Sequence, residues 1–121
     1  MDKKELYTAT NIKDVWIIRP NGELDMSNSA ELKEQIKREF IHQGKVDLII
    51  DLSHVDYMDS SALGVLIGLQ KSCRLNGGAL ILCGLEENLK RIFKMTSLDS
   101  VFSIRATVED ALKVFLEGDQ N

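Results

Sequence analysis

Two adjacent serines, Ser60 and Ser61, stand where the chain passes from a loop into an apolar helix. The run Asp59-Ser60-Ser61-Ala62-Leu63-Gly64 follows an apolar stretch that ends at Asp51. The first amides of a helix have no partner within it, and the helix dipole places partial positive charge there. A phosphate carried by a serine at this point is stabilised by the same groups. No catalytic machinery accompanies the serines, so we interpret the motif as a phosphorylation switch on which another enzyme acts.

Ser60 as an enzyme nucleophile would need a general base within hydrogen-bonding reach. The two histidines are His42, at the end of a predicted helix, and His54, in the loop before Ser60. The chain has neither a Gly-x-Ser-x-Gly turn nor a nucleotide-binding P-loop. Three nearby acids lack the spacing of a calcium loop: Asp51, Asp56 and Asp59. We therefore expect no enzymatic activity, no metal and no cofactor.

The helix that begins at Ser60 is apolar on more than one side. One face, at helical spacing, is sufficient to pack on a sheet, and it consists of Ala62, Val65, Leu66, Leu69 and Cys73. Leu63 and Ile67 fall beside that face, where they either pack under a neighbouring helix or form an apolar docking patch next to the serine. We expect the docking patch. Gly64 and Gly68 cost helix stability, which indicates that a partner or a neighbouring helix approaches closely there.

Alternating strands and helices predict an α/β fold with one mixed sheet of about five strands and four α-helices. Residues 7–11 and 15–19 predict a hairpin, and Pro20-Asn21-Gly22 is expected to end its second strand. The apolar runs at 46–52 and 79–83 are typical of central parallel strands, and 101–105 of a short edge strand. Helices are expected from Ser27 or Ser29 to His42, from Ser60 to Asn76, from Leu85 to Met95, and from Thr107 onward. We expect residues 1–121 to form a single domain.

The net charge disfavours two classes of partner, although it does not exclude a local basic patch, and the sequence shows no signal for secretion or membrane insertion. The net charge of −4 disfavours nucleic acid and anionic membranes, which select basic surfaces. The N-terminal run Met1-Asp2-Lys3-Lys4-Glu5 is not followed by a signal-like apolar segment, and no stretch is long enough to cross a membrane. Cys73 and Cys83 lie in apolar stretches and are interpreted as buried free thiols. We expect a cytoplasmic protein, and a monomer.

Asp59-Ser60-Ser61-Ala62-Leu63-Gly64 resembles the phosphorylation motif of the bacterial anti-sigma factor antagonists, in the STAS domain family. The resemblance extends over nearly the whole chain. Gly22-Glu23-Leu24-Asp25 is similar to the first loop of the family, and Gly77-Gly78 and the segment 89–93 follow in the expected order. Ala62 stands where many members have glycine, and Pro20-Asn21 is an unusual entry to the first loop.

The resemblance implies a mechanism and a set of site residues. The unphosphorylated chain would bind an anti-sigma factor that is also a serine kinase, and so release the sigma factor for transcription. The kinase would phosphorylate Ser60, rather than Ser61, and the complex would dissociate until a serine phosphatase restored the hydroxyl. The residues expected to contact the partner are Asp25, Ser27, Asp59, Ser61, Leu63, Gly64 and Ile67. Two rival interpretations are a scaffold module of a larger signalling or transport assembly and a small serine-nucleophile enzyme.

Overall fold

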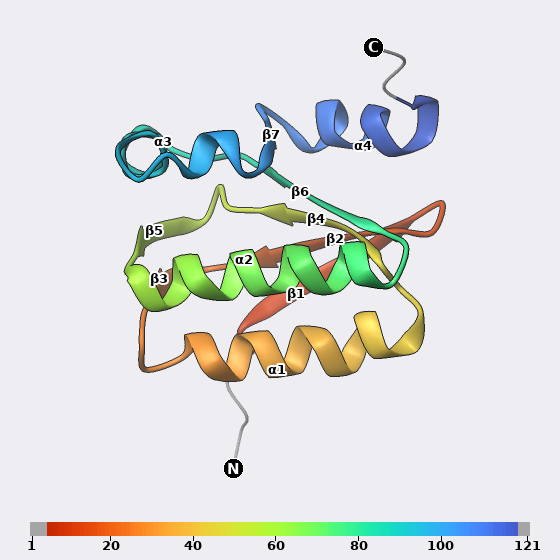
Figure 1. Cartoon of the computed structure of the whole chain (residues 1–121), viewed down its shortest axis with the longest axis horizontal. Coiled ribbons are helices and arrows are strands. Elements are labelled where there is room, and N and C mark those ends of the chain that lie inside the picture. Colours follow the sequence, from red (N-terminus) through yellow and green to blue (C-terminus); the bar gives the residue numbers. More distant parts are fainter. Residues whose placement is uncertain (1–4, 119–121) are drawn as a thin grey trace.

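The computed structural model describes residues 5–118 (Figure 1). The first four residues of the charged N-terminal run and the last three of the polar tail lie outside the described residues. The strands are β1 (Tyr7–Ile12), β2 (Val15–Pro20), β3 (Gly22–Leu24), β4 (Asp47–Asp51), β5 (Val55–Met58), β6 (Ala79–Cys83) and β7 (Ser103–Arg105). The α-helices are α1 (Ser29–Glu39), α2 (Ser60–Leu75), α3 (Glu87–Met95) and α4 (Val108–Glu117). Two 3₁₀ turns, Ile41–Gln43 and Leu98–Ser100, follow α1 and α3.

The main sheet has five strands in the order β1-β2-β4-β6-β7, which confirms the predicted mixed sheet. β1 and β2 form the antiparallel hairpin, and the other neighbours are parallel. Lys13 and Asp14 connect the hairpin with positive φ angles of 50° and 70°. Positive φ at both central residues matches the twist of a two-residue hairpin turn. β2, β4 and β6 therefore run side by side, and the loops that leave them meet at one edge of the sheet.

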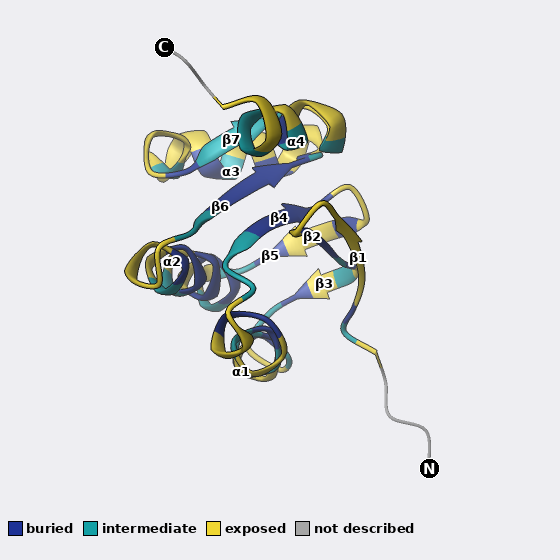
Figure 2. Cartoon of the chain, turned by 90° about the vertical axis from the view of Figure 1, so that its right-hand side faces the viewer, coloured by how far each residue is buried: buried dark blue, intermediate teal, exposed yellow. Residues whose placement is uncertain are grey.

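Helices cover both faces of this sheet (Figure 2). α1 and α2 lie side by side on one face, and α4 lies on the other. The strand β4 is buried on both faces because it is central, which explains its uninterrupted apolar run Leu48-Ile49-Ile50. The predicted inward stripe of α1, Leu32, Ile36 and Phe40, is buried as expected. None of the helices in residues 5–118 is long and apolar enough to span a membrane.

A second, two-stranded sheet was not predicted. β3 and β5 pair in parallel, with Leu24 opposite Met58. The chain was expected to leave the sheet at Pro20-Asn21-Gly22, but it bends at Gly22, which has a φ of +81°, and pairs again at once. The partner strand lies more than thirty residues away and is only four residues long, so no local pattern marks it. The loop that follows β3 and the loop that leads from β5 into α2 both leave this small sheet.

Several predicted boundaries differ from the structure. α1 ends at Glu39, before the 3₁₀ turn, whereas the sequence placed its end at His42. α3 begins at Glu87 rather than Leu85, and β7 begins at Ser103 rather than Val101. Ile41, Leu85 and Phe102 lie just outside these elements and remain buried, so hydrophobicity alone extends the predicted elements beyond their ends.

Both cysteines are free and buried, as the sequence indicated. Burial in apolar surroundings is the main cause that raises the pKa of the Cys73 thiol to about 12, with a smaller contribution from Asp47. The Cys83 thiol is raised to a pKa of about 12, again mainly by burial. Thiols with such pKa values remain protonated and unreactive at neutral pH.

Candidate functional site

Ser60 is the first residue of α2 and is exposed at the edge of the sheet. Asp59 precedes it as the N-cap residue, and its Oδ1 accepts a hydrogen bond of 3.1 Å from the Ala62 amide. The first backbone amide that donates to a carbonyl of the helix is that of Leu63, which bonds to the Asp59 carbonyl, so the amides of Ser60 and Ser61 have no partner within the helix and remain available to an anion. Ser61 is half-buried and Ser60 is the more accessible of the two hydroxyls. The structure therefore gives the Ser60 hydroxyl both exposure and donors for a phosphate.

The loop after β3 lies directly against this helix start. The Asp59 Oδ2 accepts a 3.1 Å hydrogen bond from the Met26 amide, and the Asp59 amide donates to the Leu24 carbonyl at 3.2 Å. One aspartate thus binds the loop with one oxygen and caps α2 with the other. The parallel pairing of β3 with β5 sets this approach, because both strands deliver their carboxyl ends to the same point. The loop after β3 and the loop before α2 therefore lie at the same edge of the molecule.

Asp25 and Ser27 form a compact hydrogen-bonded turn inside that loop. The Ser27 hydroxyl donates to Asp25 Oδ1 at 2.6 Å, and the Ser27 amide donates to the same oxygen at 2.9 Å. These two bonds, the hydroxyl first, hold the pKa of the Asp25 carboxyl below its ordinary value. Asp25 is partly exposed and Ser27 is exposed. The ionised Asp25 carboxylate therefore faces solvent in the loop that lies against the start of α2.

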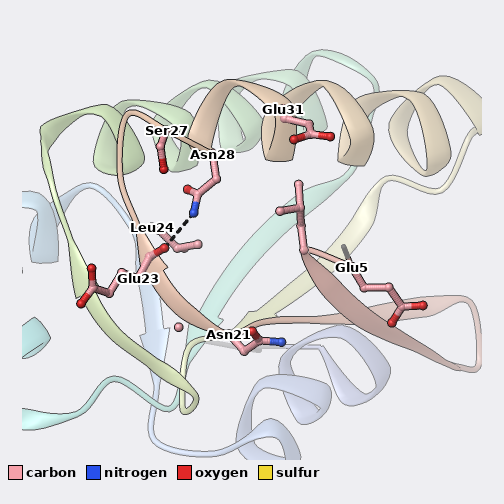
Figure 3. A pocket seen from close by; sticks show the side chains of 9 residues that line it. Glu5, Asn21, Glu23, Leu24, Ser27, Asn28 and Glu31 are labelled. Carbon is pink, nitrogen blue, oxygen red and sulfur yellow. Dashed lines mark hydrogen bonds between the residues drawn. The ribbon is translucent and has the colours of Figure 1, made fainter. Parts of the chain in front are cut away.

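Asn28 fixes the shape of the same loop, a role that no pattern in the sequence indicates. Its Oδ1 accepts from the Asp25 amide at 3.1 Å, and its Nδ2 donates to the Glu23 carbonyl at 2.9 Å (Figure 3). Behind the loop lies a hollow of about 450 Å³, partly lined by Glu23, Ser27 and Glu31. Within the described residues, no group of three or more histidine, cysteine, aspartate or glutamate side chains is arranged to hold a metal ion.

Leu63 and Ile67, which were expected to form one docking patch, have different environments. Leu63 is only 9% exposed and belongs to the core cluster that includes Phe93 and Phe102, so it does not form part of an exposed docking patch. Gln70, seven residues later on the same side of α2, is also buried and donates to the Val101 carbonyl at 3.0 Å. The segment after α3 thus covers this side of the helix. Ile67 is 38% exposed and remains available.

The remaining predicted residues and one unpredicted residue complete the surface. Gly64 is exposed on the same face as Ser60, and a Cβ built on it would meet no atom within 4 Å. Met26 is 77% exposed, although its amide is fixed by Asp59. Met26 was not predicted as a site residue; the available signal was an apolar residue between Asp25 and Ser27. Around Ser60 the structure therefore brings together Asp25, Met26, Ser27, Asp59, Ser61, Gly64 and Ile67.

The sequence profile of the STAS domain matches residues 7–111, which include both loops of the site and all of α2. The chain belongs to the STAS domain family. This STAS domain is 39% identical to an anti-sigma-B factor antagonist of Listeria monocytogenes over 84 residues, which cover 69% of this chain and 73% of the relative. It is 38% identical to the anti-sigma-B factor antagonist of Bacillus subtilis over 92 residues, which cover 76% and 83%.

Solved structures share the fold of this STAS domain. The NMR structure of the Thermotoga maritima protein TM1081 superposes with a TM-score of 0.83 at 29% identity, covering 93% of this chain and 90% of that protein. The anti-sigma factor antagonist SpoIIAA in its unphosphorylated form gives a TM-score of 0.69 at 21% identity, covering 93% and 99%. The phosphorylated form of SpoIIAA from Bacillus gives 0.68 at 24%, covering 90% and 98%. The SpoIIAA likeness shows a common fold.

Proposed function

We propose that this chain is an anti-sigma factor antagonist that is switched by phosphorylation of Ser60. In its unmodified form it binds an anti-sigma factor that is also a serine kinase, and the sigma factor is released. The observation that carries the proposal is the exposed Ser60 hydroxyl at the start of α2, next to a loop that Asp59 holds in place. The names of the Listeria and Bacillus relatives support the same function. The buried free thiols are compatible with action in a reducing cytoplasm.

The kinase transfers the γ-phosphoryl group of ATP to the Ser60 Oγ. The new P–O bond forms as the bond to the leaving ADP breaks, and a base of the kinase accepts the hydroxyl proton. A phosphatase later directs water at the phosphorus, which restores the hydroxyl and releases inorganic phosphate. This chain contributes an acceptor hydroxyl that is exposed and donors that suit the product: the Ser60 and Ser61 amides at the helix start.

Phosphorylation ends binding because of where the charge appears. A phosphate adds about 1.5 to 2 negative charges. Ser60 directly follows the carboxylate of Asp59, which holds the loop that carries Asp25 and the exposed Met26. The exposed Ile67 lies two turns further along the same helix. Docking removes water from this surface, and a dianion that loses water without a cationic partner costs several kcal/mol. The partner surface that fits a serine hydroxyl next to Gly64 therefore rejects the phosphorylated form.

The phosphorylated residue is tested by incubating the chain with ATP and the purified anti-sigma factor kinase of the same organism. Phosphopeptide mapping should place the phosphate on Ser60, and Ser60→Ala should fold normally and resist the kinase. Ser61→Ala is the matched control and should still be phosphorylated. Phosphate that persists in Ser60→Ala and is lost in Ser61→Ala would show that the wrong serine is assigned. Binding without any phosphorylation would favour the scaffold module instead.

We further propose that Asp25 contacts the kinase. Because its carboxylate is ionised and partly exposed, Asp25→Ala should weaken kinase binding and leave the fold intact. Asp99→Ala removes an exposed aspartate from the 3₁₀ turn after α3 and serves as the control. Equal affinities of the two variants would remove Asp25 from the contact surface.

A further inference from the structure

The face of α2 that carries Ser60 continues along the whole helix. Ser60, Gly64, Ile67, Lys71 and Arg74 are spaced by three or four residues, so they share one face, and all five are exposed. We call this set the Ser60 stripe. At 1.5 Å per residue it extends about 21 Å from the serine. A partner that lies along α2 to reach Ser60 therefore also covers Ile67 and Lys71.

Lys33 of α1 extends across to this stripe. A Cβ built on Gly68 would lie 2.8 Å from the Lys33 Nζ and 3.0 Å from its Cε, so the lysine passes directly over the glycine. Gly68 adjoins Ile67 and lies within one turn of Lys71. The close approach expected at the two glycines is thus explained at Gly68 by a side chain of this chain, and Gly64 remains open.

The cations continue along the neighbouring helix. α1 and α2 each connect parallel strands and run in the same direction side by side (Figure 1). Lys37 follows Lys33 by one turn, and both line a hollow of about 450 Å³ on α1 together with Ala30, Glu34, Arg38 and His42. Lys33, Lys37, Lys71 and Arg74 form what we call the cationic strip.

The cationic strip has no ion pair within the described part of the chain. The ion pairs Arg19–Asp51 and Lys90–Glu87 include none of the four residues of the strip. Complementing the helix dipole accounts for Lys37 and Arg74, which lie in the last turns of α1 and α2. It does not account for Lys33 and Lys71, which lie further inside their helices. Unpaired cations at these positions are notable in a chain whose net charge is −4.

We propose that the cationic strip binds an acidic segment of the kinase partner and steers the kinase toward Ser60. This inference rests on the proposed function. A protein partner suits the surface because the opposite end of the same face is acidic, with Asp25 and Asp59 beside the serine. A uniformly anionic surface, such as a bilayer of anionic lipids, would be attracted by the cationic strip and repelled by Asp25 and Asp59. A protein can instead present acidic groups to the strip and different groups to the serine.

The test is a charge reversal, Lys33→Glu with Lys71→Glu, measured as the association rate with the purified kinase at about 0.05 M and about 0.5 M salt. The matched control, Lys13→Glu with Lys113→Glu, changes the net charge equally and lies on the hairpin turn and on α4. We expect the rate of the strip variant to fall about tenfold or more at low salt, and the difference to shrink at high salt. The control should keep most of the wild-type rate.

Each of the following results would overturn the inference. Equal loss in both variants would show that only net charge matters, and an unchanged rate in the strip variant would show that the strip does not contact the kinase. Binding of the wild type to vesicles of phosphatidylglycerol and phosphatidylcholine, lost in the strip variant while the kinase rate is unchanged, would assign the strip to a membrane. If the wild type neither binds the kinase nor is phosphorylated, the proposed function fails and this inference fails with it. If Ser60 is phosphorylated at the same rate in the wild type and in the strip variant, this inference fails and the proposed function stands.

Discussion

Asp59 should contribute to stability as well as to the site, because each of its carboxylate oxygens accepts a different hydrogen bond. Oδ1 caps α2 at the Ala62 amide and Oδ2 holds the Met26 amide, both at 3.1 Å. Loss of an N-cap side chain costs about 1 kcal/mol. A further hydrogen bond contributes about 1 kcal/mol. We therefore expect Asp59→Ala to lower the free energy of unfolding by about 2 kcal/mol.

Urea unfolding, followed by the fluorescence of the single tryptophan Trp16, measures this change. Trp16 reports on the core because its ring contacts Phe40 at a centroid distance of 5.3 Å. With a slope of about 2 kcal/mol per molar urea, the midpoint should fall by about 1 M. Asp59→Asn keeps one acceptor oxygen and should lose about half as much.

Asp56→Ala is the matched control, since it removes an exposed aspartate three residues earlier, on β5. It should change the stability by less than about 0.5 kcal/mol. If Asp59→Ala were no more destabilising than Asp56→Ala, the reasoning that one aspartate joins the loop to α2 would be refuted.

Two further predictions concern the same site. Leu63→Ala should lower the free energy of unfolding by about 2 to 3 kcal/mol in the same assay because Leu63 is buried. Ile67→Ala should instead fold with near-normal stability and bind the kinase more weakly. If Ile67→Ala lost stability while Leu63→Ala lost only affinity for the kinase, Leu63 and not Ile67 would be the contact residue. An NMR titration should place the pKa of the Asp25 carboxyl below its ordinary value, and Ser27→Ala should raise it because the larger hydrogen bond is lost. The hydrogen bonds from Ser27 to the ionised Asp25 carboxylate are thus present at neutral pH, and their stabilisation is lost as the pH falls through that lowered pKa. An unchanged pKa of Asp25 in Ser27→Ala would contradict this cause.

The main sheet and its helices were predictable because their signals are local. The apolar runs of β4 and β6 and the inward stripe of α1 lie within single elements, and burial follows directly from them. Thr107 likewise predicted the start of α4, and its hydroxyl accepts from the Asp110 amide at 3.1 Å. Ser60 and Asp59 were placed correctly at the start of α2 for the same reason.

The parts that were missed depend on contacts between distant segments. β3 and β5 are short, and each is stable only because the other lies beside it. The hydrogen bond between the Asp59 carboxylate and the Met26 amide joins residues thirty-three positions apart and has a backbone donor, so no residue type predicts it. Leu63 was assigned to the surface because one apolar face is enough for a helix that packs on a sheet alone. α2 also packs against α1 and the segment after α3, so it needs a wider apolar surface.

The most direct test of the central claim is the affinity of the purified anti-sigma factor kinase for the chain before and after phosphorylation at Ser60. Isothermal titration with the homogeneous unmodified and phosphorylated proteins gives both dissociation constants under identical conditions. We expect the phosphorylated protein to bind about a hundredfold more weakly or worse, which corresponds to roughly 3 kcal/mol. Equal affinity of the two forms would contradict a switch at Ser60.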